Sequence, residues 1–290
     1  MYKIAIIVCL LCVNLSVSGQ LLTDSLKIGN NYRSFHFKKP ASGNVGASIV
    51  FVLHGSGGNG IGARKNAMSL EGVADKENVI VVYPDGYKRY WNECRKAATS
   101  LANVENIDEN SFFTGMISYF QKRYKTRKGH VFVVGTSGGG HMAYKLAMTM
   151  PEKINAITAI IANLPTDSNM DCVPLNKPLS VKIINGTKDP LNKYEGGEMS
   201  TGGVYLGMVR STDETVRYWA NVDGYKGEPV KSLLPDTDPA DGKTIEKYVY
   251  ESKGKPDVVL LKVINGKHDY PNDIDVHLEA WSFFKKQIYR

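Results

Sequence analysis

The sequence offers little that could hold a metal ion or a cofactor. It contains four cysteines and six histidines among 290 residues. Outside the N-terminal segment no C-x-x-C pair occurs, and no histidine cluster has the spacing of metal ligands. We therefore expect neither a metal ion nor a cofactor to take part in the function of this chain.

An apolar run long enough to cross a bilayer is also missing. The N-terminal run Ile4–Val13 has ten residues, whereas a transmembrane helix needs about 20. Lys3 precedes this run and the small residues Val17-Ser18-Gly19 follow it, which is the pattern of a secretory signal peptide. We expect residues 1–19 to be removed, and residues 20–290 to be secreted, extracellular or periplasmic, without a membrane anchor.

The predicted cleavage leaves few cysteines. Cys9 and Cys12 lie in the signal segment, so that Cys94 and Cys172 are the two that remain. An even pair in an exported chain is consistent with one disulfide bond.

The chain has no internal repeat, no low-complexity tract and no basic run with interleaved aromatics. Its formal net charge of +7 is therefore read as a solvated surface, and we expect no nucleic-acid partner. Hydrophobic residues make up 42% of the sequence, enough for one large core. Strand-like and helix-like segments alternate, which predicts a single α/β domain over residues 20–290 with a mostly parallel sheet flanked by helices.

The motif with the most chemical content is Gly135-Thr136-Ser137-Gly138-Gly139, a Gly-x-Ser-x-Gly. A β-branched run from Val131 leads into it, and a helix-like segment, Met142 to Met150, follows. This strand–turn–helix context is typical of the nucleophile elbow of an α/β-hydrolase. Glycines on both sides of Ser137 permit so sharp a bend. Ser137 is the predicted nucleophile.

A second glycine-rich loop follows an earlier strand and reads His54-Gly55-Ser56-Gly57-Gly58-Asn59-Gly60. In α/β-hydrolases such a loop supplies one backbone N–H to the oxyanion hole, and the residue after the nucleophile supplies the other. The predicted donors are Ser56 and Gly138, with Gly57 as the alternative to Ser56. The loop also fits G-x-G-x-x-G, but the acidic residue that a dinucleotide site expects about 20 residues later is missing.

An acid and a histidine follow in the chain order of this fold. The strand from Ser180 ends at Gly186-Thr187-Lys188-Asp189-Pro190, and the strand from Val258 ends at Asn265-Gly266-Lys267-His268. Both residues lie just past carboxyl ends of strands, where open α/β sheets place ligands. We expect Asp189 to orient His268 and His268 to take the Ser137 proton, with Asp269 as the next acid to test.

A family resemblance rests on these motifs and on further short segments. The further segments are Val82-Tyr83-Pro84-Asp85-Gly86, Trp91-Asn92, Asn163-Leu164-Pro165, Tyr194-Glu195-Gly196-Gly197 and His268-Asp269-Tyr270-Pro271. The chain resembles the secreted esterases that include polyhydroxybutyrate depolymerases, feruloyl esterases and acetylxylan esterases. The resemblance covers nearly all of residues 20–290. It implies the α/β-hydrolase fold, Ser137, Asp189 and His268 as the triad, and a bond between Cys94 and Cys172, which match positions where the group often has cysteines.

The resemblance also bears on the substrate. It places Trp91 and the Tyr194 loop near the substrate, and Tyr270 directly follows the His268 turn; each of them could instead simply pack the loops. The segment Lys193 to Val209, which includes Tyr205, is expected to be an irregular loop over the active-site face. Departures from the group fall at the pocket: Gly138 stands where a larger residue is usual, and Tyr270 replaces a tryptophan.

The predicted function is a secreted serine esterase that forms an acyl-enzyme on Ser137. The expected substrate is a feruloyl or acetyl ester of a plant polysaccharide or oligosaccharide. The alternative is a polyhydroxybutyrate or other polyester depolymerase. A secreted peptidase, or a binding protein that kept the fold without the chemistry, fits the sequence less well.

Overall fold

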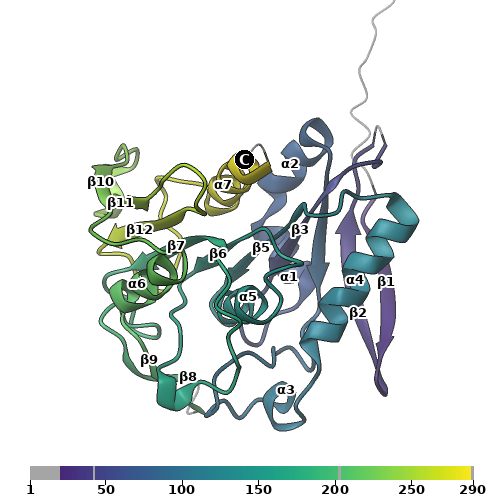
Figure 1. Ribbon diagram of the computed structural model, residues 1–290, viewed down its shortest axis with the longest axis horizontal. Coiled ribbons are helices and arrows are strands. Elements are labelled where there is room, and N and C mark those ends of the chain that lie inside the picture. The colour runs from purple at the N-terminus through teal and green to yellow at the C-terminus, as the bar shows by residue number, and fades with distance from the viewer. Residues whose placement is uncertain (1–19, 42, 202–203, 289–290) are drawn as a thin grey trace, which may run out of the picture.

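A ten-stranded mixed sheet forms the centre of the molecule (Figure 1). The computed structural model describes residues 20–41, 43–201 and 204–288; the predicted signal peptide lies outside them. The strand order is β1-β2-β4-β3-β5-β6-β7-β12-β11-β10. The six strands from β4 to β12 pair in parallel, and the strands at both edges pair antiparallel. The predicted mostly parallel sheet flanked by helices is confirmed.

The parallel strands are short and buried on both faces, as a sheet covered by helices requires. They are β3 (Ser48–Leu53), β4 (Val79–Pro84), β5 (Val131–Thr136), β6 (Ala156–Ile160), β7 (Ser180–Gly186) and β12 (Val258–Ile264). The antiparallel edge strands are β1 (Leu22–Ile28), β2 (Asn31–Lys38), β10 (Val230–Leu233) and β11 (Thr244–Tyr250).

Helices cover the two faces of the sheet separately. One face packs against α4 (Glu109–Tyr124), α5 (Gly138–Thr149) and α6 (Thr212–Val222). The other face packs against α1 (Gly60–Asn66), α2 (Met68–Glu77) and α7 (Val276–Ile288). Neighbouring residues of β5 show the division, because Val133 lies in the first core and Phe132 in the second. None of the described helices is both long and apolar enough to cross a membrane.

Several small elements complete the chain. They are α3 (Leu101–Val104), the 3₁₀ turns η1 (Asp167–Asn169) and η2 (Pro239–Asp241), and a separate two-stranded sheet of β8 (Gly197–Thr201) and β9 (Val204–Val209). The expected irregular loop over Lys193 to Val209 is therefore wrong in its second half. A β-bulge between Met199 and Ser200 interrupts the pairing of β8 with β9. Because of the bulge, buried and exposed residues do not alternate regularly along these strands, and that alternation is the pattern by which strands are predicted.

Candidate active site

Ser137 stands at a strained turn between β5 and α5. Its φ of 54° and ψ of −118° lie outside the regions that ordinary residues adopt. The turn is tight: a β-carbon on Gly135 would lie 2.0 Å from the Gly139 carbonyl oxygen, and one on Gly139 would lie 2.4 Å from the Leu53 carbonyl oxygen. Both glycines are therefore required by space, and α5 begins at Gly138 rather than at Met142 as the sequence suggested.

Three side chains from three strand ends form one hydrogen-bonded chain. His268 Nε2 lies 3.0 Å from Ser137 Oγ, and His268 Nδ1 lies 2.7 Å from Asp189 Oδ2. The other carboxylate oxygen, Oδ1 of Asp189, accepts the backbone N–H groups of Leu191 and Asn192 at 2.8 and 2.9 Å. With Asp189 ionised, Nδ1 carries the proton and Nε2 is left to accept from Ser137. This arrangement suits general-base activation of a serine.

Asp269, the other acid considered from the sequence, has different partners. Both of its carboxylate oxygens lie 3.2 Å from Lys243 Nζ, and Oδ1 also accepts the Lys267 N–H. Asp269 is exposed, whereas Asp189 is only 4% exposed. The structure thus brings Asp189, and not Asp269, to the imidazole of His268.

Two backbone N–H groups next to Ser137 have no partner within the described ranges. They belong to Gly138 and Ser56. A β-carbon on Gly138 would lie 2.9 Å from the Ser56 nitrogen and 2.5 Å from Ser56 Oγ, so the two residues are in direct contact. The alternative donor, Gly57, donates to the Arg89 carbonyl oxygen instead. Unpaired N–H groups at a helix start can bind an oxyanion.

His54 holds the loop that carries Ser56 through hydrogen bonds from both of its ring nitrogens. The Nδ1–H of His54 donates to the Gly55 carbonyl oxygen, and Nε2 accepts the Gly86 N–H at 2.9 Å. Burial lowers the pKa of His54, which keeps the imidazole neutral for these two bonds. His54 therefore has a structural role, because both of its ring nitrogens are used to hold the loop.

Trp91 lines a cavity of about 250 Å³ together with Ser56 and Gly138. Its Nε1–H donates to the His54 carbonyl oxygen at 2.9 Å, and its indole packs on the His54 ring. Trp91 is only 3% exposed, so it forms a wall that both packs the loop and faces the site.

A buried ion pair in this cavity was missed by the sequence reasoning. The Arg95 guanidinium donates to Glu93 Oε1 through Nε and Nη2, at 2.9 and 2.7 Å, and both residues line the cavity. The remaining nitrogen, Nη1, points at Met199 Sδ, 3.1 Å away, which is a weak acceptor. In the sequence, Glu93 and Arg95 stand on either side of Cys94. A disulfide at Cys94 holds both neighbours in place, so this pattern could have predicted the ion pair.

Tyr270 contacts the residue that precedes Ser137. Its hydroxyl is 2.6 Å from Thr136 Oγ1, in the residue before Ser137, and burial raises the pKa of this phenol. It lines a hollow of about 430 Å³ that also includes Ser56 and His277. Tyr270 is thus brought close to the site, with its hydroxyl engaged by the elbow.

Tyr194 is not brought together with the other candidates. Its hydroxyl donates to Asp213 Oδ1 at 2.6 Å, and Lys262 Nζ lies 4.7 Å from the centre of its ring. It lines a separate hollow of about 200 Å³, and no triad residue lines that hollow. Its contact with substrate remains a prediction.

Cys94 and Cys172 form the predicted disulfide, with 5.1 Å between their Cα atoms. Cys94 lies in the segment that carries Trp91, Glu93 and Arg95, and Cys172 follows η1. The bond thus joins the cavity wall to the segment after β6.

Comparison with known proteins gives modest similarities. No protein-family model matches the chain. One relative is NocK of Nocardia uniformis subsp. tsuyamanensis, which is named as an esterase. The two chains are 24% identical over 234 residues, which cover 78% of this chain and 66% of NocK. The chain is 25% identical over 190 residues to acetylxylan esterase A of Talaromyces purpureogenus, covering 59% of this chain and 49% of the relative. The chain thus spans two thirds or less of these relatives.

Solved structures resemble the chain more completely. The acetyl xylan esterase from Aspergillus awamori superposes with a TM-score of 0.62 at 17% identity, covering 90% of this chain and 99% of the other. The chain has the α/β-hydrolase fold. The resemblance to an esterase group, stated from the motifs, is confirmed by relatives that carry esterase names.

The α/β-hydrolase fold alone does not choose the reaction. A solved structure from Bacteroides ovatus, described as a dipeptidyl aminopeptidase IV, also superposes, with a TM-score of 0.58 at 15% identity, over 92% of this chain and 36% of the other. The function has to be argued from the site.

Proposed function

We propose that this protein is a serine esterase that hydrolyses carboxylic esters through Ser137, His268 and Asp189. The observation that carries the proposal is the unbroken chain of hydrogen bonds from Asp189 through His268 to Ser137, with distances of 2.7 and 3.0 Å. The esterase names among relatives and structural neighbours support the same reaction class.

The proposed reaction proceeds in two halves. Ser137 Oγ attacks the ester carbonyl carbon while His268 Nε2 takes its proton, and the carbonyl oxygen becomes an oxyanion held by the N–H groups of Gly138 and Ser56. His268 then gives the proton to the leaving alcohol, which leaves an acyl group on Ser137. Water attacks this acyl-enzyme in the same way and releases the acid.

We further propose acetyl or feruloyl esters of plant polysaccharide as the substrate class. Two kinds of observation support this: the acetylxylan esterases among the relatives, and the cavity beside Ser56 and Gly138, whose volume of about 250 Å³ suits a small acyl group. The cavity wall formed by Trp91 offers an apolar surface, and Glu93 and Arg95 offer polar atoms.

Secretion belongs to the same proposal. The disulfide between Cys94 and Cys172 supports an oxidising compartment, and the N-terminal 19 residues read as a signal peptide.

The nucleophile is tested by substitution. Ser137→Ala is expected to lower the turnover of p-nitrophenyl acetate by roughly four to six orders of magnitude, as removal of a triad serine does elsewhere. The matched control is Ser25→Ala, an exposed serine on β1 that is expected to have no effect. A fully active Ser137→Ala protein would refute the mechanism.

A substrate panel tests the class. The wild-type protein is expected to have a higher kcat/KM on acetylated xylan or methyl ferulate than on a 3-hydroxybutyrate oligomer. A tenfold or greater preference for the 3-hydroxybutyrate oligomer would replace the polysaccharide-esterase proposal with the polyester one.

A further inference from the structure

His268 comes from a strand that is not a neighbour of the strand before Ser137. In the strand order, β6 and β7 lie between β5, which leads into Ser137, and β12, which precedes His268. Neighbouring strands lie about 4.8 Å apart, so that β5 and β12 are separated by about 14 Å. The loop after β12, residues 265–273, spans this distance and brings His268 Nε2 to 3.0 Å from Ser137 Oγ. The position of His268 therefore depends on what holds this loop against residues 135–139, the elbow.

Most hydrogen bonds of the loop fix its end above β7. The Lys188 N–H donates to the Gly266 carbonyl oxygen at 2.8 Å, and the Asn265 N–H donates to Thr187 Oγ1 at 2.9 Å. Other bonds of the loop go to residues 237–243. None of these partners belongs to β5 or to the elbow, so these bonds leave the reach of the loop toward Ser137 unfixed.

Among the described residues, the loop makes two hydrogen bonds to the elbow. One is the bond between His268 and Ser137 itself, and the other joins the Tyr270 hydroxyl to Thr136 Oγ1 at 2.6 Å. Thr136 directly precedes Ser137, and Tyr270 follows His268 by two residues. The second bond therefore joins the same two segments as the first.

Tyr270 is itself held on the side away from the elbow. Its ring packs edge-on against His277 of α7, with 5.8 Å between the ring centres, and His277 is only 3% exposed. Pro271 restricts the backbone of Tyr270 to extended conformations. Burial raises the pKa of the Tyr270 phenol, so the hydroxyl keeps its proton for the bond. The hydroxyl thus stands on a fixed support.

The elbow needs such a contact because its backbone is strained. The φ of 54° at Ser137 is a value that persists only where the surroundings fix the chain. The Ser137 N–H donates to the Ile160 carbonyl oxygen at 2.8 Å, and the Thr136 side chain is held by Tyr270. A shift of the elbow or of the loop changes the distance between Ser137 Oγ and His268 Nε2, on which proton transfer depends.

We propose that Tyr270 is a positioning residue, whose hydrogen bond to Thr136 keeps His268 Nε2 within hydrogen-bonding distance of Ser137 Oγ. This inference rests on the proposed function, since it assumes that His268 takes the Ser137 proton. The hydroxyl does not touch the reacting atoms. It serves both halves of the reaction, because His268 transfers a proton in each of them.

Removal of either hydroxyl group tests the role. Tyr270→Phe keeps the ring, and Thr136→Val keeps the branched shape. Each is expected to lower kcat and kcat/KM for p-nitrophenyl acetate together by about 10- to 50-fold, with KM within twofold of wild type, because a displaced base slows proton transfer but not binding. The double variant is expected to fall no further than either single variant, because both remove the same bond. Thr136→Ser keeps a hydroxyl group and is expected to retain kcat within threefold.

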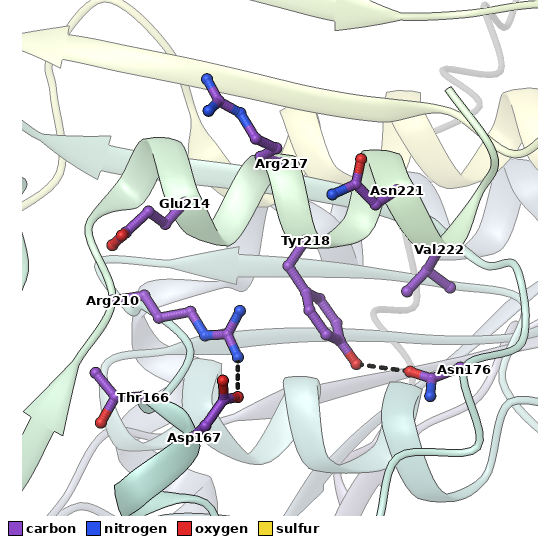
Figure 2. A pocket seen from close by; sticks show the side chains of 9 residues that line it. All are labelled: Thr166, Asp167, Asn176, Arg210, Glu214, Arg217, Tyr218, Asn221 and Val222. Atoms are coloured by element: carbon purple, nitrogen blue, oxygen red, sulfur yellow. Dashed lines mark hydrogen bonds and ion pairs between the residues drawn. The ribbon is translucent and has the colours of Figure 1, made fainter. Parts of the chain in front are cut away.

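Tyr218 provides the matched control. Figure 2 shows its ring reaching from α6 across a hollow of about 710 Å³ to Asn176, while Arg210 pairs with Asp167. Tyr218 is half-buried like Tyr270, and its hydroxyl donates to Asn176 Oδ1 at 3.1 Å, but no triad residue lines this hollow. Tyr218→Phe therefore removes a similar bond and is expected to leave kcat unchanged. Urea unfolding confirms that each variant is folded under the assay conditions.

Labelling by a fluorophosphonate reagent measures the reactivity of Ser137 without ester turnover. The labelling rate is expected to fall in Tyr270→Phe and Thr136→Val by about the same factor as kcat. Wild-type rates in these two variants would overturn the positioning role, and so would losses that add in the double variant or a change confined to KM. A wild-type protein that neither hydrolyses p-nitrophenyl acetate nor is labelled at Ser137 would overturn the proposed function, and the role of Tyr270 with it.

Discussion

Gly138 and Ser56 occupy one small space next to Ser137, the proposed nucleophile. The missing side chain of Gly138 leaves room for Ser56 Oγ, which would lie 2.5 Å from a β-carbon there. The sequence showed that Gly138 departs from its group, but only the structure shows what fills the gap. The two proposed oxyanion donors therefore depend on each other for their positions.

A substitution at Gly138 tests this dependence. Gly138→Ala is expected to lower kcat on p-nitrophenyl acetate by about 10- to 100-fold, because the new methyl group displaces Ser56 and its N–H. Adding Ser56→Gly removes the closer contact, to the hydroxyl, but leaves the Ser56 nitrogen 2.9 Å from the new carbon, so it is expected to recover only part of the loss. Gly72→Ala is the matched control, since nothing lies within 4 Å of the added carbon. A double variant no more active than Gly138→Ala would contradict the shared space.

The acid can be tested by a pair of matched substitutions. Asp189→Asn is expected to lower kcat by about three to four orders of magnitude, because an amide cannot hold the Nδ1–H tautomer of His268 in place as a carboxylate does. Asp269→Asn is expected to change kcat less than threefold, since Asp269 binds Lys243. If the two effects were reversed, the hydrogen bond of 2.7 Å between His268 and Asp189 would not be the catalytic one.

At the scale of elements, strand ends were easier to predict than the segments between them. Ser137, Asp189 and His268 each follow a short apolar strand, and parallel strands bring their carboxyl ends to one edge. The β8–β9 sheet was read as a loop because its bulge hides the two-residue period. Tyr194 was placed near the substrate by resemblance, whereas its position follows from contacts with Asp213 and Lys262 that lie far from it in sequence.

The disulfide joins two such segments. Cys94 and Cys172 are 78 residues apart, and closing a loop of that length stabilises a chain by up to about 4 kcal/mol. Backbone hydrogen bonds already join the same segments, from Lys96 N–H to the Asn169 carbonyl oxygen and from Asp171 N–H to the Cys94 carbonyl oxygen. We therefore expect the folded state to keep its shape when the bond is absent.

We expect the Cys94→Ser, Cys172→Ser double variant to lose about 2–4 kcal/mol of unfolding free energy. Urea unfolding of wild type and variant measures this loss, and wild type in reductant should match the variant. Turnover of p-nitrophenyl acetate at 25 °C is expected to stay within about threefold, because no triad residue belongs to the joined segments. Equal urea midpoints for the two proteins would mean that the bond does not stabilise the fold.

At the scale of the whole molecule, the sequence predicted the layers but not the buried charges. Alternating strands and helices indicated one mostly parallel sheet, and 42% hydrophobic residues indicated one large core. Buried groups such as Arg33 and Glu109, whose side chains pair at 3.0 Å, come from segments 76 residues apart. Such pairs depend on tertiary packing, and no local sequence pattern predicts them.

One buried carboxyl group ties the stability of the whole molecule to pH. Asp223 ends α6, is 4% exposed, and accepts the Leu179 N–H at 3.0 Å. Burial, and then the charge of nearby Asp257, raises the pKa of Asp223 from 3.8 to about 7. The folded protein therefore holds a proton on Asp223 between pH 4 and 7 that the unfolded chain releases.

The sign of the effect follows from proton binding. Where the folded state binds more protons than the unfolded state, the free energy of unfolding falls as pH rises. The Asp223 contribution thus declines from about pH 4 to about pH 7 and is constant above that range. Three pKa units correspond to at most about 4 kcal/mol.

Asp223→Asn removes this titration and keeps an oxygen for the Leu179 N–H. The quantity of interest is the unfolding free energy of the variant minus that of wild type. We expect this difference to be about 2–4 kcal/mol larger at pH 8 than at pH 4.5. Urea unfolding of both proteins at the two pH values measures this difference. The contributions of all other titrating groups to the unfolding free energy are the same in both proteins and cancel. Asp236→Asn, a change at an exposed carboxyl group, is the control and should show no such difference. A gain at pH 8 no larger than that at pH 4.5 would mean that Asp223 is ionised in the folded protein throughout, and that the surroundings of Asp257 and Leu179 tolerate a second buried charge.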